Sequence, residues 1–221
     1  MQRLEAPHEF FIFVDRTSMT TRHNYDLTGG FTSRCAELLA SPTGTQKLDA
    51  GQIDLLPFKQ NPDQYPFLSP FVVKLTTELW IEYEAERLRK AKHPQFPSRL
   101  SAIYAFGDKA TCVEVALRHR WDLASVRRFT LAPGMPYRVV RVNMEIVSLM
   151  RTVFRLASWQ VEDSDRIWSH YWVGNGNLQV STPDIEGFGG QRTWDSGVIW
   201  EWLIEGRLVS KDKTPVFPEA K

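Results

Sequence analysis

The segment Val198–Ile204 (VIWEWLI) constrains the fold more than any other part of the sequence. Its length and its β-branched and aromatic content predict a strand. Because alternate side chains of a strand face opposite sides, Glu201 shares a face with Leu203, while Trp200 and Trp202 face the other way. At an edge of the sheet the carboxylate would lie in water. On a central strand it must be paired or functional, because an unpaired buried charge is costly.

The other segments alternate between strands and helices without a repeating βαβ unit, which predicts an α+β fold. The length of 221 residues suits a single well-packed domain over 1–221. Further strands are predicted over 10–14, 99–106, 127–131, 137–142 and 207–209. Helices are predicted over 33–39, 74–92, 109–120, 144–157 and 165–172, with Asp108 and Asn143 as N-caps.

Three segments lack a regular pattern. Residues 41–70 contain five prolines and two glycines, which predicts a long surface loop able to cover a site or meet a partner. Residues 181–197 are rich in Gly, Asp and Thr and predict a second loop. The Pro-containing tail, 211–221, is expected to fray or to dock loosely.

Several kinds of chemistry have no support in the sequence. The five histidines and two cysteines do not form a metal-ligand pattern, and two cysteines are too few for a disulfide scaffold. No Gly-rich dinucleotide turn, phosphate-binding loop or Gly-x-Ser-x-Gly elbow is present. The first residues lack a signal-peptide layout, and no apolar run is long enough to span a membrane. We therefore expect a cytoplasmic protein with no metal and no membrane partner.

Four polar residues next to predicted strands are candidate ligands of an anion or a ring. Arg99 and Ser101 enter a strand after Pro97, where hydroxyls close a turn; alternatively, the guanidinium binds phosphates bidentately. Arg16 follows the first strand and is either surface charge or an anion clamp. Tyr104 either packs in the core or stacks on a ligand ring.

Basic residues cluster at 87–99 and 118–128, although the net charge is only +1. Such clusters are either solvated surface or a rim that guides a polyanion or a pyrophosphate. The high aromatic content is explained first by packing.

The order of these segments resembles the ADP-ribosyltransferase superfamily, especially its compact bacterial and phage-defence toxin-like members. The resemblance rests on the following segments, in this order: FFIFV (10–14), ERLR (86–89), PSRLSAIYAF (97–106), YWVG (171–174) and WEWLIEG (200–206). It implies a split mixed or antiparallel β core with flanking helices.

The resemblance also implies the site residues. Glu201 matches the catalytic glutamate, and the loop Thr182–Gly197 matches the loop that recognises the acceptor. Ser101, with Arg99 beside it, matches the serine or tyrosine of the middle strand that supports the nicotinamide side, which makes Ser101 the second expected catalytic residue. The first strand contains no histidine, which favours an Arg-Ser-Glu arrangement over a His-Tyr-Glu one.

NAD is then the substrate, and Arg16, Arg99 and Tyr104 are its expected contacts. Arg16 lies just beyond the first strand, whereas the basic residue of the family usually lies within it. The nicotinamide–ribose bond would break through an oxocarbenium-like state, which Glu201 would stabilise while it hydrogen-bonds the ribose 2′-hydroxyl.

The acceptor implied by the resemblance is a macromolecule. The basic stretches and the aromatic residues favour RNA or single-stranded DNA slightly over protein. A toxin or phage-defence effector of this kind would need an antitoxin, and the 41–70 loop is one place for it to dock. Two alternatives stay open: NAD hydrolysis without an acceptor, and a non-catalytic binding or assembly protein whose tryptophans line an interface.

Overall fold

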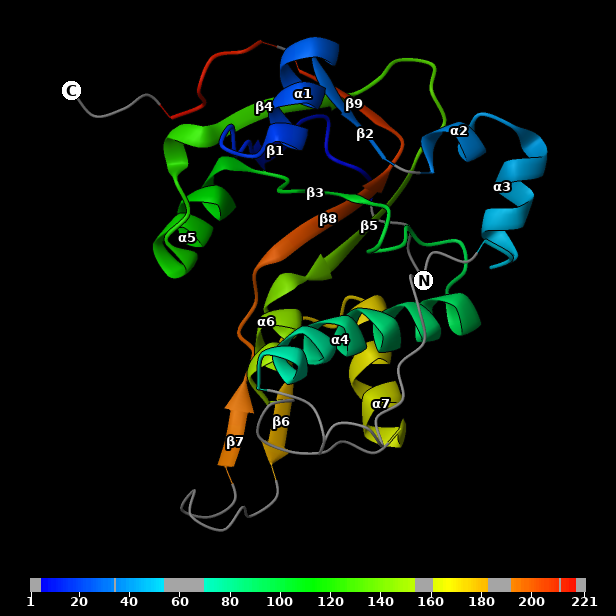
Figure 1. The fold of residues 1–221 in the computed structure, drawn as a ribbon, viewed down its shortest axis with the longest axis vertical. Coiled ribbons are helices and arrows are strands. Elements are labelled where there is room, and N and C mark those ends of the chain that lie inside the picture. Colours follow the sequence, from blue (N-terminus) through cyan, green and yellow to red (C-terminus); the bar gives the residue numbers. More distant parts are fainter. Residues whose placement is uncertain are drawn as a thin grey trace. The chain divides into compact units, whose positions relative to one another are not determined.

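The chain divides into two compact units. The computed structural model describes residues 5–33, 35–53, 70–153, 161–182, 192–210 and 212–217. The first unit comprises Met1–Ile53, Gln95–Arg141 and Ile199–Lys221, and the second comprises Asp54–Pro94 and Val142–Val198. Figure 1 shows helices and antiparallel sheets without βαβ repeats, so the predicted α+β class is confirmed. The single domain over 1–221 stays a prediction.

The first unit contains two sheets, apart from Val142 and Asn143 at the end of one strand, which belong to the second unit. One has the strand order β1-β4-β9-β2 and the other the order β3-β8-β5. The pairs β1–β4, β4–β9, β2–β9 and β3–β8 are antiparallel. The strands are β1 (Phe10–Phe13), β2 (Gly30–Thr32), β3 (Ile103–Ala105), β4 (Val126–Leu131), β5 (Arg138–Asn143), β8 (Trp200–Glu205) and β9 (Arg207–Ser210).

The described helices of this unit begin at a Ser or Asp side chain that caps the first turn, except the one after Cys35, whose side chain makes no capping hydrogen bond. They are α1 (Met19–Thr28), α2 (Ala36–Leu39), α3 (Pro42–Asp49) and α5 (Lys109–His119), with a 3-10 helix at Leu123–Ser125. The predicted cap at Asp108 is confirmed, since its side chain accepts a hydrogen bond from the Thr111 backbone N–H. The tail is tied at Val216, whose N–H donates to the Val126 carbonyl.

The prediction of a loop over 41–70 is wrong for residues 42–49, which form α3. The Ser41 side chain accepts from the Gly44 N–H, and Pro42 occupies the first turn. Proline is favoured there because its missing N–H is not needed and its φ is already helical. Residues 54–69 of the predicted loop lie outside the described part of the chain.

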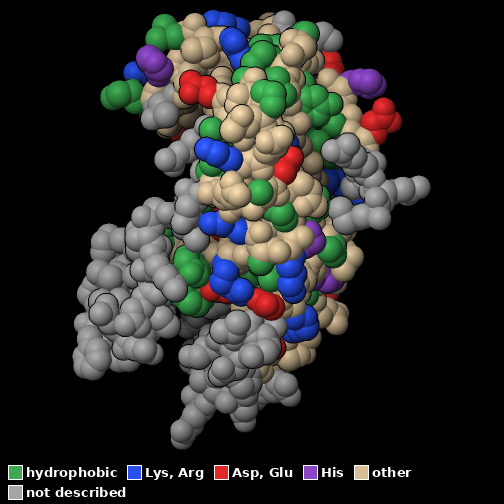
Figure 2. All heavy atoms as spheres, turned by 90° about the vertical axis from the view of Figure 1, so that its right-hand side faces the viewer, with side chains coloured by type: hydrophobic (Ala, Val, Ile, Leu, Met, Phe, Trp, Pro, Cys, Tyr) green, Lys and Arg blue, Asp and Glu red, His purple; other side chains and the backbone are tan. Residues whose placement is uncertain are grey.

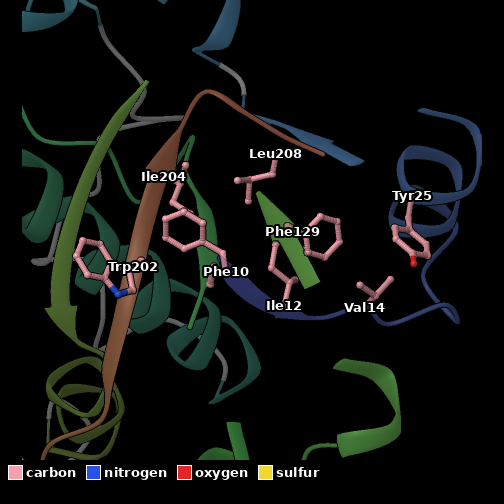
Figure 3. Close-up of a cluster of buried hydrophobic side chains, with 9 residues drawn as sticks. Phe10, Ile12, Val14, Tyr25, Phe129, Trp202, Ile204 and Leu208 are labelled. Atoms are coloured by element: carbon pink, nitrogen blue, oxygen red, sulfur yellow. The ribbon is translucent and has the colours of Figure 1, made fainter. Parts of the chain in front are cut away.

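The core of the first unit lies on one face of β8. Figure 3 shows Trp202 and Ile204 of β8 among Phe10, Phe129 and Leu208 from the neighbouring strands. Trp202 is 6% exposed, and its ring contacts that of Phe10 edge to face, with 6.2 Å between the centroids. Trp202 and Ile204 on this face of the strand are therefore used in packing.

The second unit is built around three helices. They are α4 (Pro70–Lys92), α6 (Met144–Val153) and α7 (Val161–Trp172), and α4 packs against both of the others. The Trp172 indole N–H on α7 donates to the Ala85 carbonyl of α4 at 2.9 Å. Asn143 accepts from the Glu145 N–H at 3.1 Å, which confirms it as the cap of α6.

The prediction of a loop over 181–197 is wrong at its two ends. Strands β6 (Gln179–Thr182) and β7 (Arg192–Asp195) pair as an antiparallel hairpin. Thr182 and Thr193 are β-branched, and Trp194 is aromatic, so both strands contain residue types that pleated sheets favour. Residues 183–191 of the expected recognition loop lie outside the described part.

Among the described residues, no helix combines the length and the apolarity that a bilayer crossing requires.

Candidate functional site

Glu201 lies on a central strand, because β8 runs between β3 and β5. Glu201 and Glu205 face the same side of β8 as Leu203, opposite to the face that packs in the core. Both carboxylates are buried, at 6% and 0% exposure. A buried carboxylate on a central strand needs a partner, and Glu201 has one in the structure.

That partner is Arg99. Its Nη1 lies 3.3 Å from Glu201 Oε1, and the two side chains, 102 positions apart in the sequence, are 5% and 8% exposed. The guanidinium also lies over the ring of Tyr104, 5.3 Å from its centroid. The Tyr104 hydroxyl donates to the Arg99 carbonyl at 2.7 Å. Three of the residues singled out from the sequence thus meet at one place in the first unit.

Arg99 projects from a turn, and the predicted strand start at this residue is wrong. The Ser98 carbonyl accepts from the N–H groups of Ser101 and Ala102, at 3.1 and 2.8 Å. These bonds curl the chain, so β3 begins only at Ile103. The turn places the guanidinium over the polar face of the sheet.

Ser101 contacts a second carboxylate, that of Glu205. Its hydroxyl donates to Glu205 Oε1, which also accepts from the Ser98 N–H at 3.0 Å. Glu205 Oε2 accepts from both Nε (2.9 Å) and Nη2 of Arg138 on β5. Every acceptor of Glu205 is thus used by groups of the first unit, as a buried carboxylate requires.

Sequence reasoning missed Glu205 and Arg138. The signal for Glu205 was present, since it follows Glu201 by four positions and therefore shares its face of the strand. No comparable signal marked Arg138, which stands in a strand that also contains Arg141.

Cys35 is buried beside this network. Burial and the neighbouring Glu205 carboxylate raise the pKa of the Cys35 thiol above its ordinary value. A thiol with a raised pKa is a poor nucleophile near neutral pH, so Cys35 is not suited to attack a substrate.

Arg16, the other expected NAD contact, pairs elsewhere. Its guanidinium lies 3.2 Å from Asp26 of α1, and the Arg16 side chain is 58% exposed. Nothing in the described contacts of Arg16 links it to Glu201.

A shallow groove in the first unit lies at the start of α5, where His8, Asp108 and Lys109 contribute to its lining. Neither Arg99 nor Glu201 lines it. Arg99 and Glu201 are paired with each other and buried, and a ligand in the groove would not touch them.

The basic stretches do not form a continuous cationic surface. Arg87, Arg89 and Arg99 each form an ion pair with a carboxylate. Arg128 pairs with two carboxylates, and Arg127 donates to backbone carbonyls. On the face drawn in Figure 2, Lys and Arg side chains are interspersed with Asp and Glu. Much of this charge therefore serves internal pairing.

The arrangement offers two chemical capabilities. A guanidinium in a water-poor site binds phosphate or carboxylate oxygens strongly, because its donors match their geometry. A carboxylate in the same place stabilises a neighbouring positive charge and accepts a hydrogen bond from a hydroxyl.

Within the described residues, no group of three or more His, Cys, Asp or Glu side chains is arranged to hold a metal ion. A scan against models of known protein families gave no match, and a search of curated proteins gave no significant one.

Proposed function

We propose that this chain is a mono-ADP-ribosyltransferase that uses NAD as its substrate and Glu201 as its catalytic carboxylate. The proposal depends on one observation. Arg99, from a turn, pairs with Glu201 on the central strand β8, 102 positions away in the sequence, and the ring of Tyr104 lies beside them. The resemblance in the order of segments assigns the same residues to NAD.

In the proposed reaction, the bond between the nicotinamide nitrogen and ribose C1′ breaks, and nicotinamide leaves with the bonding electrons. A nucleophilic atom of the acceptor then bonds to C1′ and loses its proton. Glu201 hydrogen-bonds the ribose 2′-hydroxyl and stabilises the positive charge of the oxocarbenium-like state. It can also take up the proton of the acceptor.

The closed ion pair has a role in this mechanism. The pyrophosphate of NAD competes with Glu201 for the Arg99 guanidinium, since phosphates are bound bidentately by arginine. Binding of the anion would then release the carboxylate toward the ribose. Tyr104, which is 39% exposed, is available to the nicotinamide side of the ligand.

We propose that the β3-β8-β5 sheet and the β1-β4-β9-β2 sheet correspond to the two halves of the split β core that the resemblance implies. This finer assignment within the α+β class belongs to the proposal.

For the acceptor, we propose RNA or single-stranded DNA ahead of protein. Arg118 and Arg120 are exposed at the end of α5, and the ring of Trp121 beside them is 44% exposed. Basic and stacking side chains together are what single strands require. An antitoxin partner, and a role as a toxin or phage-defence effector, are parts of the same proposal.

The experiment is incubation of the purified protein with adenylate-labelled NAD and a cell extract, followed by separate nuclease and protease digestion. We expect label on macromolecules that nuclease releases and protease does not. Glu201→Gln should lower the transfer about 100-fold or more. Glu114→Gln, which changes an exposed carboxylate on α5, is the matched control and should transfer normally. Normal transfer by Glu201→Gln would remove Glu201 from the catalytic role.

A second candidate function is non-catalytic binding or assembly, which the burial and pairing of Glu201 favours. The melting temperature separates the two readings, because a true substrate stabilises the folded state. Stabilisation by NAD supports the enzyme. No shift with millimolar NAD, together with no release of nicotinamide, supports the binding protein. Release of nicotinamide without labelled macromolecules identifies NAD hydrolysis instead.

A further inference from the structure

The backbone on both sides of Arg99 is anchored to one carboxylate. Glu205 Oε1 accepts from the Ser98 N–H at 3.0 Å and from the Ser101 hydroxyl. Ser98 precedes Arg99 by one position, and Ser101 follows it by two. Glu205 therefore holds the turn at both of its ends, and Arg99 lies between these two fixed points.

Glu205 is itself held firmly. Its other oxygen accepts from Nε and Nη2 of Arg138, whose Nη1 lies 3.1 Å from Asp49 at the end of α3. Immediately after Glu205, the Gly206 N–H donates to Ser33 Oγ at 2.8 Å, and the Gly206 carbonyl accepts from the Ser33 N–H at 2.9 Å. The carboxylate thus has little freedom to move relative to the sheet.

The rest of the Arg99 environment completes the positioning. The Tyr104 hydroxyl binds the Arg99 carbonyl, and the same ring lies beneath the guanidinium. Backbone and side chain are consequently fixed by neighbours that come from the turn, from β3 and from β8. The guanidinium is thus held between the Tyr104 ring and the Glu201 carboxylate.

From these contacts we infer that Glu205 is a positioning residue. It acts through Ser98 and Ser101 to set the turn that presents Arg99 to Glu201, and thereby to an anionic ligand of the site. The inference deepens the proposed function and rests on it for the identity of that ligand. It also gives Ser101 a role different from the one the family resemblance implies: Ser101 links Glu205 to the turn, whereas the resemblance matches it to a residue that supports the nicotinamide side of NAD.

Glu205 is not the reacting carboxylate in this scheme. It is 0% exposed, and the protein already occupies both of its oxygens. A substrate hydroxyl could bind it only by displacing a charged or backbone donor that would then remain buried and unpaired. Two carboxylates four positions apart on one strand face thus have separate tasks, one toward the ligand and one toward the turn.

The test uses Ser101→Ala, which removes the hydrogen bond from the Ser101 hydroxyl to Glu205 without changing any charge. We expect the KM for NAD to rise about tenfold, with kcat within about threefold of wild type, because a misdirected Arg99 weakens binding of the pyrophosphate. Ser101→Thr retains a hydroxyl and should restore most of the loss. Asp108→Ala, which removes the N-cap of α5 and also lowers stability, is the control and should leave KM unchanged.

A second readout needs no activity. In protein labelled with ¹⁵N-arginine and free of NAD, the Nε–H signal of Arg99 is assigned from its loss in Arg99→Lys. Ser101→Ala should shift or broaden this signal and leave that of Arg89 in place. Ser101→Thr should return the Arg99 signal toward its wild-type position.

These outcomes separate the inference from the proposed function. If wild-type protein does not consume NAD but the Arg99 signal moves in Ser101→Ala and returns in Ser101→Thr, the transferase proposal fails and the positioning role stands. An Arg99 signal that does not respond to Ser101→Ala overturns the positioning role, whatever the activity. A fall in kcat with unchanged KM would also overturn it, because Ser101 would then act in the chemistry.

Discussion

The two faces of β8 are stabilised in different ways. On one face, Trp202 and Ile204 pack into an apolar cluster; on the other, Glu201 and Glu205 are held by arginines. Apolar burial is favourable in itself, whereas a buried ion pair must first overcome the desolvation of two charges. Apolar residues of similar volume would often stabilise such a strand equally well. The charged face is therefore poorly explained by stability alone, and this is the reason we propose a chemical role for one of its carboxylates.

The largest expected effect is on the apolar face. Trp202→Ala should lower the free energy of unfolding by about 3–5 kcal/mol, because a large buried ring leaves a cavity. Leu117→Ala is the control, since its side chain is 79% exposed and should matter by no more than about 0.5 kcal/mol. Denaturant titration measures both. Equal losses in the two variants would contradict the assignment of Trp202 to the core.

A smaller loss of unfolding free energy is expected at Glu205, on the charged face of β8. Glu205→Gln should cost about 2–4 kcal/mol, because the amide nitrogen must face one of two sets of donors and leave it unsatisfied. The same denaturant titration measures this loss. A variant as stable as wild type would mean that the Glu205 network does not hold the turn.

Ligand binding sharpens the comparison further. Arg99→Lys should raise the KM for NAD about tenfold, since lysine lacks the planar fork and the stacking on Tyr104. Arg16→Ala serves as the matched control, because Arg16 is exposed and pairs with Asp26. Steady-state kinetics separate the two variants. A larger rise in KM for Arg16→Ala than for Arg99→Lys would mean that Arg16, and not Arg99, binds NAD.

The smallest effect concerns the thiol beside the charged face. Because burial and Glu205 raise the pKa of Cys35, its alkylation should begin at a higher pH than that of an ordinary thiol. Alkylation rates from pH 7 to 10, resolved by peptide mapping, measure the onset. Reaction of Cys35 at the pH of a free thiol would mean that the network is open to solvent.

The sequence was enough to predict the strand around Glu201 and its need for a partner. Both follow from the segment itself, through the alternation of its side chains and the cost of burying a charge. The sequence also predicted the caps at Asp108 and Asn143, where the capping side chain adjoins its own helix. The helix at 42–49 was missed because Pro42 was weighed as a breaker, although Ser41 before it is a cap.

The pairing inside the site was beyond the reach of the sequence. Glu201 and Glu205 lie on the same face, about 13 Å apart along an extended strand, and periodicity cannot tell which of them Ser101 reaches. The answer depends on the turn at 98–101, where backbone hydrogen bonds curl a segment that composition alone predicts to be extended.

The two carboxylates are proposed to have separate roles, Glu201 in catalysis and Glu205 in holding the turn, and one paired measurement tests this most directly. NAD-dependent transfer and melting temperature are recorded together for Glu201→Gln and Glu205→Gln. We expect Glu201→Gln to lose transfer about 100-fold and to melt somewhat below wild type, because it weakens one buried pair with Arg99. We expect Glu205→Gln to melt lower still, because it disturbs donors on both of its oxygens. Full transfer by Glu201→Gln, with transfer lost in a Glu205→Gln protein that melts normally, would exchange the two roles and contradict the claim.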